Sequence, residues 1–100
     1  MNIDHVDEIK LKTSIKSVLT EILGDGHQVF VFGSRVTGKN MKRSDIDIGV
    51  QGQAPVSLEI FAKAREALEN LPYLYKFDLV DFAKADEDFK KVAMQKIEIL

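Results

Sequence analysis

The chain has no cysteine among its 100 residues. It can therefore form no disulfide, carries no thiol nucleophile and offers no cysteine ligand to a metal. It also has no apolar run near the ~18–20 residues that cross a bilayer, and its polar first residues, 1–4, are unlike a signal peptide. These absences predict a cytoplasmic protein with no membrane association.

A large excess of charge of either sign is missing as well. The formal net charge is −2, which argues against direct binding of nucleic acid through a broad basic surface. Apolar residues make up 45% of the chain and charged residues 30%, an ordinary balance for a globular domain. The length predicts one domain with a modest core, burying roughly 60–70% of the surface of the unfolded chain.

Helix and strand patterns alternate along the chain, which predicts an α/β domain with a mixed sheet of at least three strands and helices packed on it. The expected helices cover residues 4–23, a segment between an N-cap at Ser57 and Pro72, and a last segment capped by Asp86. The expected strands cover residues 29–32, 45–50 and 77–82.

The apolar positions predict which side of each helix faces the core. In the first helix these positions are Ile15, Val18, Leu19, Ile22 and Leu23. In the second they are Leu58, Phe61, Ala62 and Leu68, and in the last Phe89, Val92, Ala93, Ile97 and Leu100.

The turn after the first expected strand has the composition of a phosphate site. Gly33 lets the backbone approach a ligand closely, and Ser34 supplies a hydroxyl and an amide N–H for phosphate oxygens. A plain helix N-cap at Ser34 is the competing explanation, and the two roles can coexist.

Two aspartates, Asp45 and Asp47, begin the second expected strand. Alternate residues of a strand share a face, so both carboxylates point the same way. Their mutual repulsion would be relieved by a divalent cation, and hard oxygen ligands of this kind suit Mg²⁺. The alternative is a solvated strand edge.

A third carboxylate, Asp78, lies in the otherwise apolar third strand, where burial would be costly without a partner. A metal shared with Asp45 and Asp47 would provide one, and two ions could divide the work between the attacking and the leaving oxygens. A salt bridge to Lys76 is the competing explanation. Asp81 is the competing carboxylate, but it falls on the opposite strand face from Asp78.

Gly33, Ser34, Asp45, Asp47 and Asp78 together resemble the motif of the nucleotidyltransferases of the DNA polymerase beta superfamily. The ten residues between Gly-Ser and Asp-x-Asp are similar to the spacing in minimal nucleotidyltransferases (MNT), which pair with HEPN-domain toxins in prokaryotic toxin–antitoxin systems. Arg35, Gly38 and Ser44 also fit the family wording. The resemblance covers nearly the whole chain and implies a single minimal nucleotidyltransferase domain over residues 1–100.

The resemblance implies Mg²⁺-dependent transfer of AMP from ATP to a hydroxyl, that of a tyrosine on a cognate HEPN toxin, with the chain acting as antitoxin in a hetero-oligomer. Asp45, Asp47 and Asp78 would be the catalytic and metal-binding residues, with two Mg²⁺ ions. Gly33, Ser34 and Arg35 would bind the nucleotide.

Two other functions stay open from the sequence. The chain could be a catalytically weak or inactive nucleotide-binding module that neutralises its partner by direct contact. It could also transfer a nucleotide to a small molecule, although so short a chain leaves little room for an acceptor pocket.

Overall fold

The computed structural model describes residues 8–24, 26–33, 46–73 and 75–100. Along these residues the elements follow in the order α1 (Glu8–Leu23), β1 (Gln28–Phe32), β2 (Ile46–Gln51), α3 (Leu58–Glu69), β3 (Phe77–Asp81), α4 (Glu87–Ala93) and β4 (Ile97–Ile99). The predicted α/β class with a mixed sheet is confirmed. The predicted start of the first helix, residues 4–7, lies outside the described residues.

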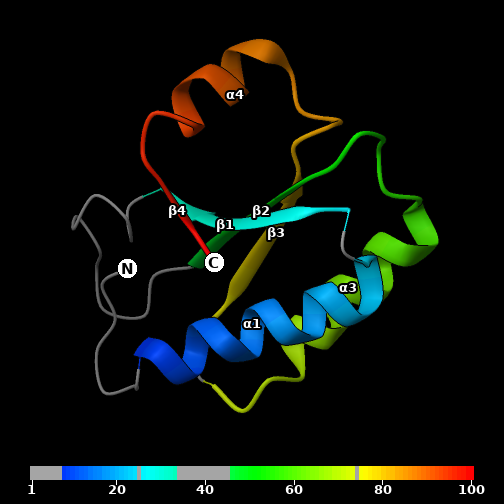
Figure 1. Ribbon diagram of the computed structural model, residues 1–100, viewed down its shortest axis with the longest axis vertical. Coiled ribbons are helices and arrows are strands. Elements are labelled where there is room, and N and C mark those ends of the chain that lie inside the picture. Colours follow the sequence, from blue (N-terminus) through cyan, green and yellow to red (C-terminus); the bar gives the residue numbers. More distant parts are fainter. Residues whose placement is uncertain (1–7, 25, 34–45, 74) are drawn as a thin grey trace.

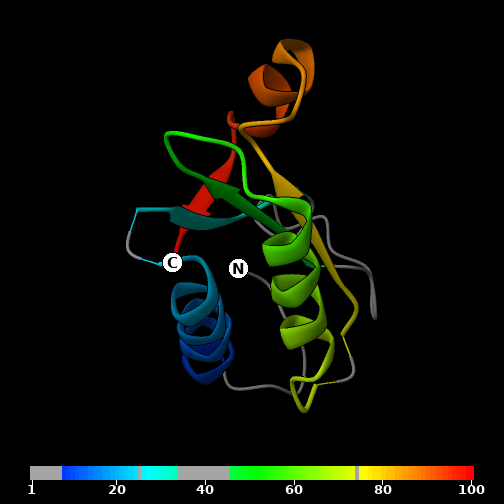
Figure 2. The same ribbon diagram turned by 90° about the vertical axis from the view of Figure 1, so that its right-hand side faces the viewer.

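The sheet has four strands in the order β3-β2-β1-β4. β1 pairs antiparallel with both β2 and β4, whereas β2 and β3 run parallel. β1 and β2 are therefore interior strands, as the bulky residues on both faces of residues 29–32 indicate. Helices α1 and α3 cover one face of the sheet, and α4 lies on the other side of it (Figures 1 and 2).

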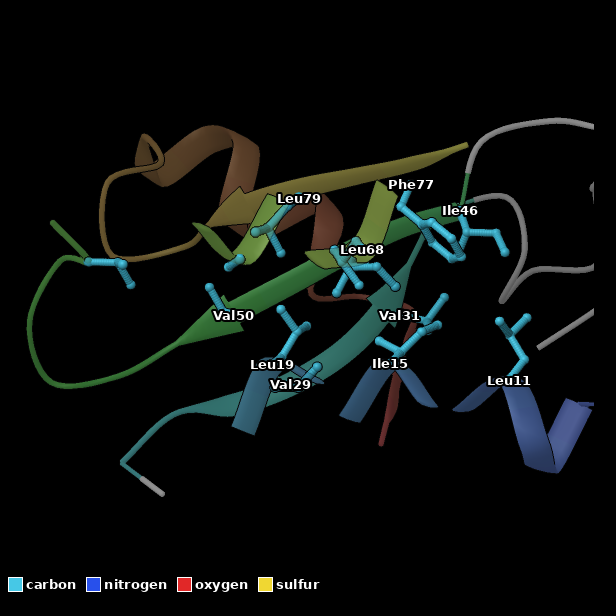
Figure 3. Packing of buried hydrophobic residues seen from close by; sticks show 13 residues of the cluster. Leu11, Ile15, Leu19, Val29, Val31, Ile46, Val50, Leu68, Phe77 and Leu79 are labelled. Atoms are coloured by element: carbon cyan, nitrogen blue, oxygen red, sulfur yellow. The ribbon is translucent and has the colours of Figure 1, made fainter. Parts of the chain in front are cut away.

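The main core fills the space between the sheet and the pair α1 and α3. Ile15 of α1 lies against Val31 of the sheet and Leu19 against Val29, and Leu11 belongs to the same cluster (Figure 3). The other members of this cluster come from β2, β3, α3 and the segment before α3: Ile46, Ile48, Val50, Val56, Ala64, Leu68, Phe77 and Leu79. Each large aliphatic side chain buried here contributes about 1.5–3 kcal/mol, so this layer holds the sheet in place.

A smaller aromatic cluster lies on the opposite face. Phe30 and Phe32 of β1 pack against Phe82, with ring centroids 4.8 and 5.2 Å from it. A side chain at Gly49 would put its Cβ only 2.7 Å from the Phe82 ring, so glycine is what lets this ring approach β2. Phe89 of α4 meets Phe32 edge to face at 6.0 Å. This aromatic cluster is what connects α4 to the sheet.

The prediction that the last helix continues to the end of the chain is wrong beyond its second turn. α4 ends at Ala93, and Ile97 and Leu100, which were expected on its apolar stripe, belong to the segment that forms β4 and its end. The reason is the open edge of β1: Ile97 and Ile99 pair with Phe32 and Phe30, and the Leu100 N–H donates to the Val29 carbonyl at 2.9 Å. Pairing with β4 satisfies backbone N–H and C=O groups on the edge of β1 that would otherwise be left without a strand partner.

Four apolar residues that were predicted to face the core are exposed. Leu58 is 80% exposed, Val92 is 69% exposed, and Phe89 is 40% exposed although its ring meets Phe32; Ala62 is exposed as well. Leu68 of α3 is buried as predicted, and Phe61 packs against the core. The other buried residue of this helix is Ala64, on a different side of the helix from Leu58 and Ala62. The N-caps are confirmed: Ser57 accepts from the Ile60 N–H, and Asp86 from the Phe89 N–H.

Among the described residues, no helix combines the length and the apolar character needed to cross a membrane.

Candidate active site

The candidate site lies at the end of the sheet where β1 finishes and β2 and β3 begin. Gly33 follows the last residue of β1, and Asp47 and Asp78 are the second residues of β2 and β3. Asp47 pairs with Phe32 of β1 on one side and with Asp78 of β3 on the other. Strand pairing thus brings together three of the predicted residues, which lie up to 45 positions apart in the sequence.

Asp47 and Asp78 are direct partners in the parallel ladder, on strands about 4.8 Å apart. Their neighbours Ile46, Phe77 and Leu79 are buried under α1 and α3, so the two aspartates belong to the other face. The predicted separation of the faces is confirmed for both strands. Two carboxylates held this close on one face suit a shared cation.

Gly33 lies directly against the carboxylate of Asp47. Its φ is +85°, in the region that favours glycine. A Cβ built at this position would collide with Oδ2 of Asp47 and lie 3.4 Å from its Cγ. Gly33 is therefore required twice, once for the turn itself and once to leave room for a predicted metal ligand.

The burial argument for Asp78 is wrong. The side chain of Asp78 is exposed, although Phe77 and Leu79 on either side of it are buried. The alternation of the strand explains this difference, because Asp78 points to the face that α1 and α3 do not cover. Asp78 thus needs no partner to offset desolvation and is open to a ligand from outside.

Asp81 is the buried carboxylate of β3, at 5% exposure, and its role was missed. Its Oδ2 accepts from the Val56 N–H at 2.8 Å, and its Oδ1 accepts from the Ala83 N–H at 3.0 Å. It therefore anchors the segment before α3 to the end of β3. The sequence gives one signal for this role: Asp81 shares a strand face with Phe77 and Leu79, so it points into the core.

Ser34, Arg35 and Asp45 lie outside the described residues, so their predicted roles stay predictions. Within the described part of the chain there is no group of three His, Cys, Asp or Glu side chains that could hold a metal. The pair of Asp47 and Asp78 nevertheless fits Mg²⁺, which commonly takes one or two carboxylates and completes its shell with water and substrate phosphates.

A family model described as "Polymerase beta, Nucleotidyltransferase" matches residues 13–100. The chain is 32% identical over 78 residues to a Haemophilus influenzae protein named "Probable protein adenylyltransferase MntA", covering 78% of this chain and 68% of that protein.

Solved structures show the same fold. A protein described as a candidate minimal nucleotidyltransferase is 26% identical, with a TM-score of 0.73, over 98% of this chain and all (100%) of that one. A tri-AMPylated Shewanella oneidensis HEPN toxin in complex with MNT antitoxin matches with a TM-score of 0.71 at 18% identity, over 93% of this chain and 71% of that chain. With the family model covering nearly the whole chain and the carboxylate pair in register beside Gly33, the chain belongs to the polymerase beta nucleotidyltransferase family.

Proposed function

We propose that this chain is a cytoplasmic, Mg²⁺-dependent nucleotidyltransferase that transfers AMP from ATP to a tyrosine hydroxyl of a HEPN-domain protein and thereby acts as an antitoxin. The observation that carries the proposal is the register of Asp47 with Asp78, on one face, beside the turn at Gly33. This is the arrangement that a phosphoryl-type transfer needs: carboxylates for the metal next to a backbone turn for the phosphates.

The strand order supports the following assignment of roles. Gly33, Ser34 and Arg35, which follow β1 in the sequence, would seat the triphosphate. Asp45 and Asp47 would hold Mg²⁺, and Asp78 on β3 would serve the acceptor. Bound Mg²⁺ neutralises the phosphate charge and orients the reacting oxygens. The turn at Gly33 lies on the β1 side of Asp47, and Asp78 lies on its β3 side.

In the reaction, the acceptor oxygen forms a bond to the α-phosphorus while the bond from that phosphorus to the α–β bridging oxygen breaks. The electron pair of the broken bond leaves with pyrophosphate, and the acceptor proton passes to Asp78 or to water. The protein acts by positioning and by balancing charge, without a covalent enzyme intermediate.

The choice of AMP and of a HEPN partner rests on the relatives. The curated relative is named as an adenylyltransferase, and the Shewanella structure contains an AMPylated HEPN toxin with an MNT antitoxin. The motif of Gly33, Ser34, Asp45, Asp47 and Asp78 resembles that of the same family.

The test is to incubate the purified chain with α-labelled ATP, Mg²⁺ and the HEPN-domain protein encoded beside it, and to follow the label on each polypeptide. The matched control is the double variant Asp45→Asn, Asp47→Asn. Label on the partner that disappears with the double variant supports the proposal, and mapping the labelled peptide identifies the acceptor.

Absence of label with a stable complex still forming would contradict the proposal. The alternative function, neutralisation by direct contact, would then be favoured, and the double variant would neutralise the toxin as well as the natural chain does.

A further inference from the structure

Lys76 lies beside the carboxylates although no motif includes it. It comes directly before β3, and its carbonyl oxygen accepts the Ile46 N–H at 2.8 Å, so its backbone already belongs to the parallel ladder with β2. Side chains alternate along a strand, and Phe77 faces the core. Lys76 therefore shares the face of Asp78, two residues or roughly 6–7 Å along the strand.

The position of Lys76 on the sheet decides which part of the reaction it can reach. With the order β3-β2-β1-β4, the phosphate turn at Gly33 lies on the β1 side of Asp47 and Lys76 on the β3 side. In the proposed in-line reaction, pyrophosphate leaves on the side of β1 and the acceptor arrives on the side of β3. Lys76 is thus on the acceptor side, away from the leaving group.

The chemistry of lysine suits this place. An ammonium on a flexible four-carbon stem can follow a moving phosphoryl group, and it provides a positive charge without metal coordination. Lys76 is exposed, so it needs no conformational change to meet a substrate. Among the described residues, Asp78 on the same strand and its ladder partner Asp47 on β2 are carboxylates on this face of the sheet.

We propose that Lys76 is the acceptor-side cation of this site: it contacts the transferring phosphoryl group as the acceptor hydroxyl attacks, and in the metal-free protein it balances the charge of Asp47 and Asp78. This inference rests on the proposed function, which it deepens by assigning a substrate contact. Lys76 makes and breaks no bond. It stabilises the charge that develops on the phosphoryl oxygens, which distinguishes it from the residues of the phosphate turn.

The matched control is Lys84. Both lysines are exposed and flank β3, but Lys84 follows its opposite end, where its N–H donates to the Asp81 carbonyl at 3.0 Å. The variants are Lys76→Met, which keeps the length and removes the charge, Lys76→Arg, which keeps the charge, and Lys84→Met.

In the AMP-transfer assay, Lys76→Met should lower kcat roughly 10- to 100-fold, the range for loss of one charge-assisted hydrogen bond. The KM for ATP should change less than about threefold, because the triphosphate is held elsewhere. Lys76→Arg should recover most of the rate, and Lys84→Met should behave like the natural chain. An increase in the KM for ATP without a fall in kcat, or equal effects of Lys76→Met and Lys84→Met, would overturn the assignment.

A second measurement does not depend on turnover. Because Lys76 opposes a cation at the carboxylates, Lys76→Met should tighten the binding of Mn²⁺ to the nucleotide-free protein roughly two- to tenfold at low ionic strength, and salt should reduce this difference. A purely structural lysine would not slow transfer and tighten metal binding together. If the natural chain transferred no AMP, the proposed function would fail, and tighter Mn²⁺ binding in Lys76→Met would still support the location of the charge. Unchanged Mn²⁺ affinity would contradict it.

Discussion

Replacement of Gly33 by alanine separates backbone strain from damage to the site. At a φ of +85°, an L residue is less stable than glycine by about 1–2 kcal/mol. The added Cβ would also collide with Oδ2 of Asp47, and moving that side chain off its rotamer costs a further 0.5–1.5 kcal/mol or so. Gly33→Ala should therefore lower the free energy of unfolding by about 1.5–3.5 kcal/mol.

The chain offers a close control in Gly24, which follows α1 with a φ of +86° and has nothing within 4 Å of an added Cβ. Gly24→Ala should cost only the backbone strain of about 1–2 kcal/mol. In a domain of this size, each kcal/mol corresponds to a shift of roughly 4–8 °C in Tm. Thermal and urea unfolding followed by circular dichroism would measure both variants.

Calorimetric titration with Mn²⁺ provides the second part of the assay. Gly33→Ala should weaken Mn²⁺ binding because the carboxylate of Asp47 is displaced, whereas Gly24→Ala should leave it unchanged. If both variants lost the same stability and bound Mn²⁺ equally well, the contact between Gly33 and Asp47 would have no role in placing the carboxylate, and the reasoning would be refuted.

Two further predictions concern charged side chains outside this turn. Asp81→Ala should lower the free energy of unfolding by about 2–4 kcal/mol in urea titrations, because one buried and one partly buried N–H group lose their acceptor. Asp78→Ala should change it by less than about 0.5 kcal/mol and abolish AMP transfer. The reverse ranking would contradict the assigned roles. The ion pair of Lys12 with Glu98 joins α1 to β4. Partial burial by itself would raise the pKa of Glu98, but the hydrogen bond from Lys12 helps to bring that pKa below its ordinary value. The pKa of Lys12 is raised by its hydrogen bonds to Glu98 and Glu8. The lowered pKa of Glu98 contributes stability that is present above about pH 4.5 and is lost as the pH falls through the pKa of the folded state. The raised pKa of Lys12 contributes stability that is present below about pH 10.5 and is lost as the pH rises through the pKa of the folded state. Glu98→Gln should flatten the acid side of a plot of urea midpoint against pH. The difference should correspond to no more than about 1 kcal/mol in the free energy of unfolding, since the pair is partly exposed. An unchanged slope would show that the pair does not contribute.

Local sequence patterns were sufficient for the parts of the fold that depend on periodicity and caps. The stripe through Ile15 and Leu19 predicted the buried side of α1, and Ser57 and Asp86 predicted two helix starts. The alternation in residues 77–81 predicted that Asp78 and Asp81 face opposite sides. These features follow from the geometry of a single element, so neighbouring residues contain the information.

Tertiary pairing decided what the local patterns could not. The apolar positions Val92, Ala93, Ile97 and Leu100 fit a helix. Without β4, however, one edge of β1 would have no strand partner, and pairing with β4 satisfies the backbone N–H and C=O groups on that edge. Similarly, Asp78 looked costly among apolar neighbours, and only the placement of α1 and α3 on one face showed that it is exposed.

By itself, the sequence determined the family and the candidate residues, because the chemistry of phosphate and metal requires particular side chains at a particular spacing. It could not bring Gly33, Asp47 and Asp78 together, since proximity between strands depends on register and strand order. The tertiary structure decided that Gly33 leaves room for the carboxylate of Asp47, that Asp81 is a structural anchor, and that the backbone of Lys76 pairs with β2. Each of these relations joins residues through strand pairing or side-chain contact and not through sequence spacing.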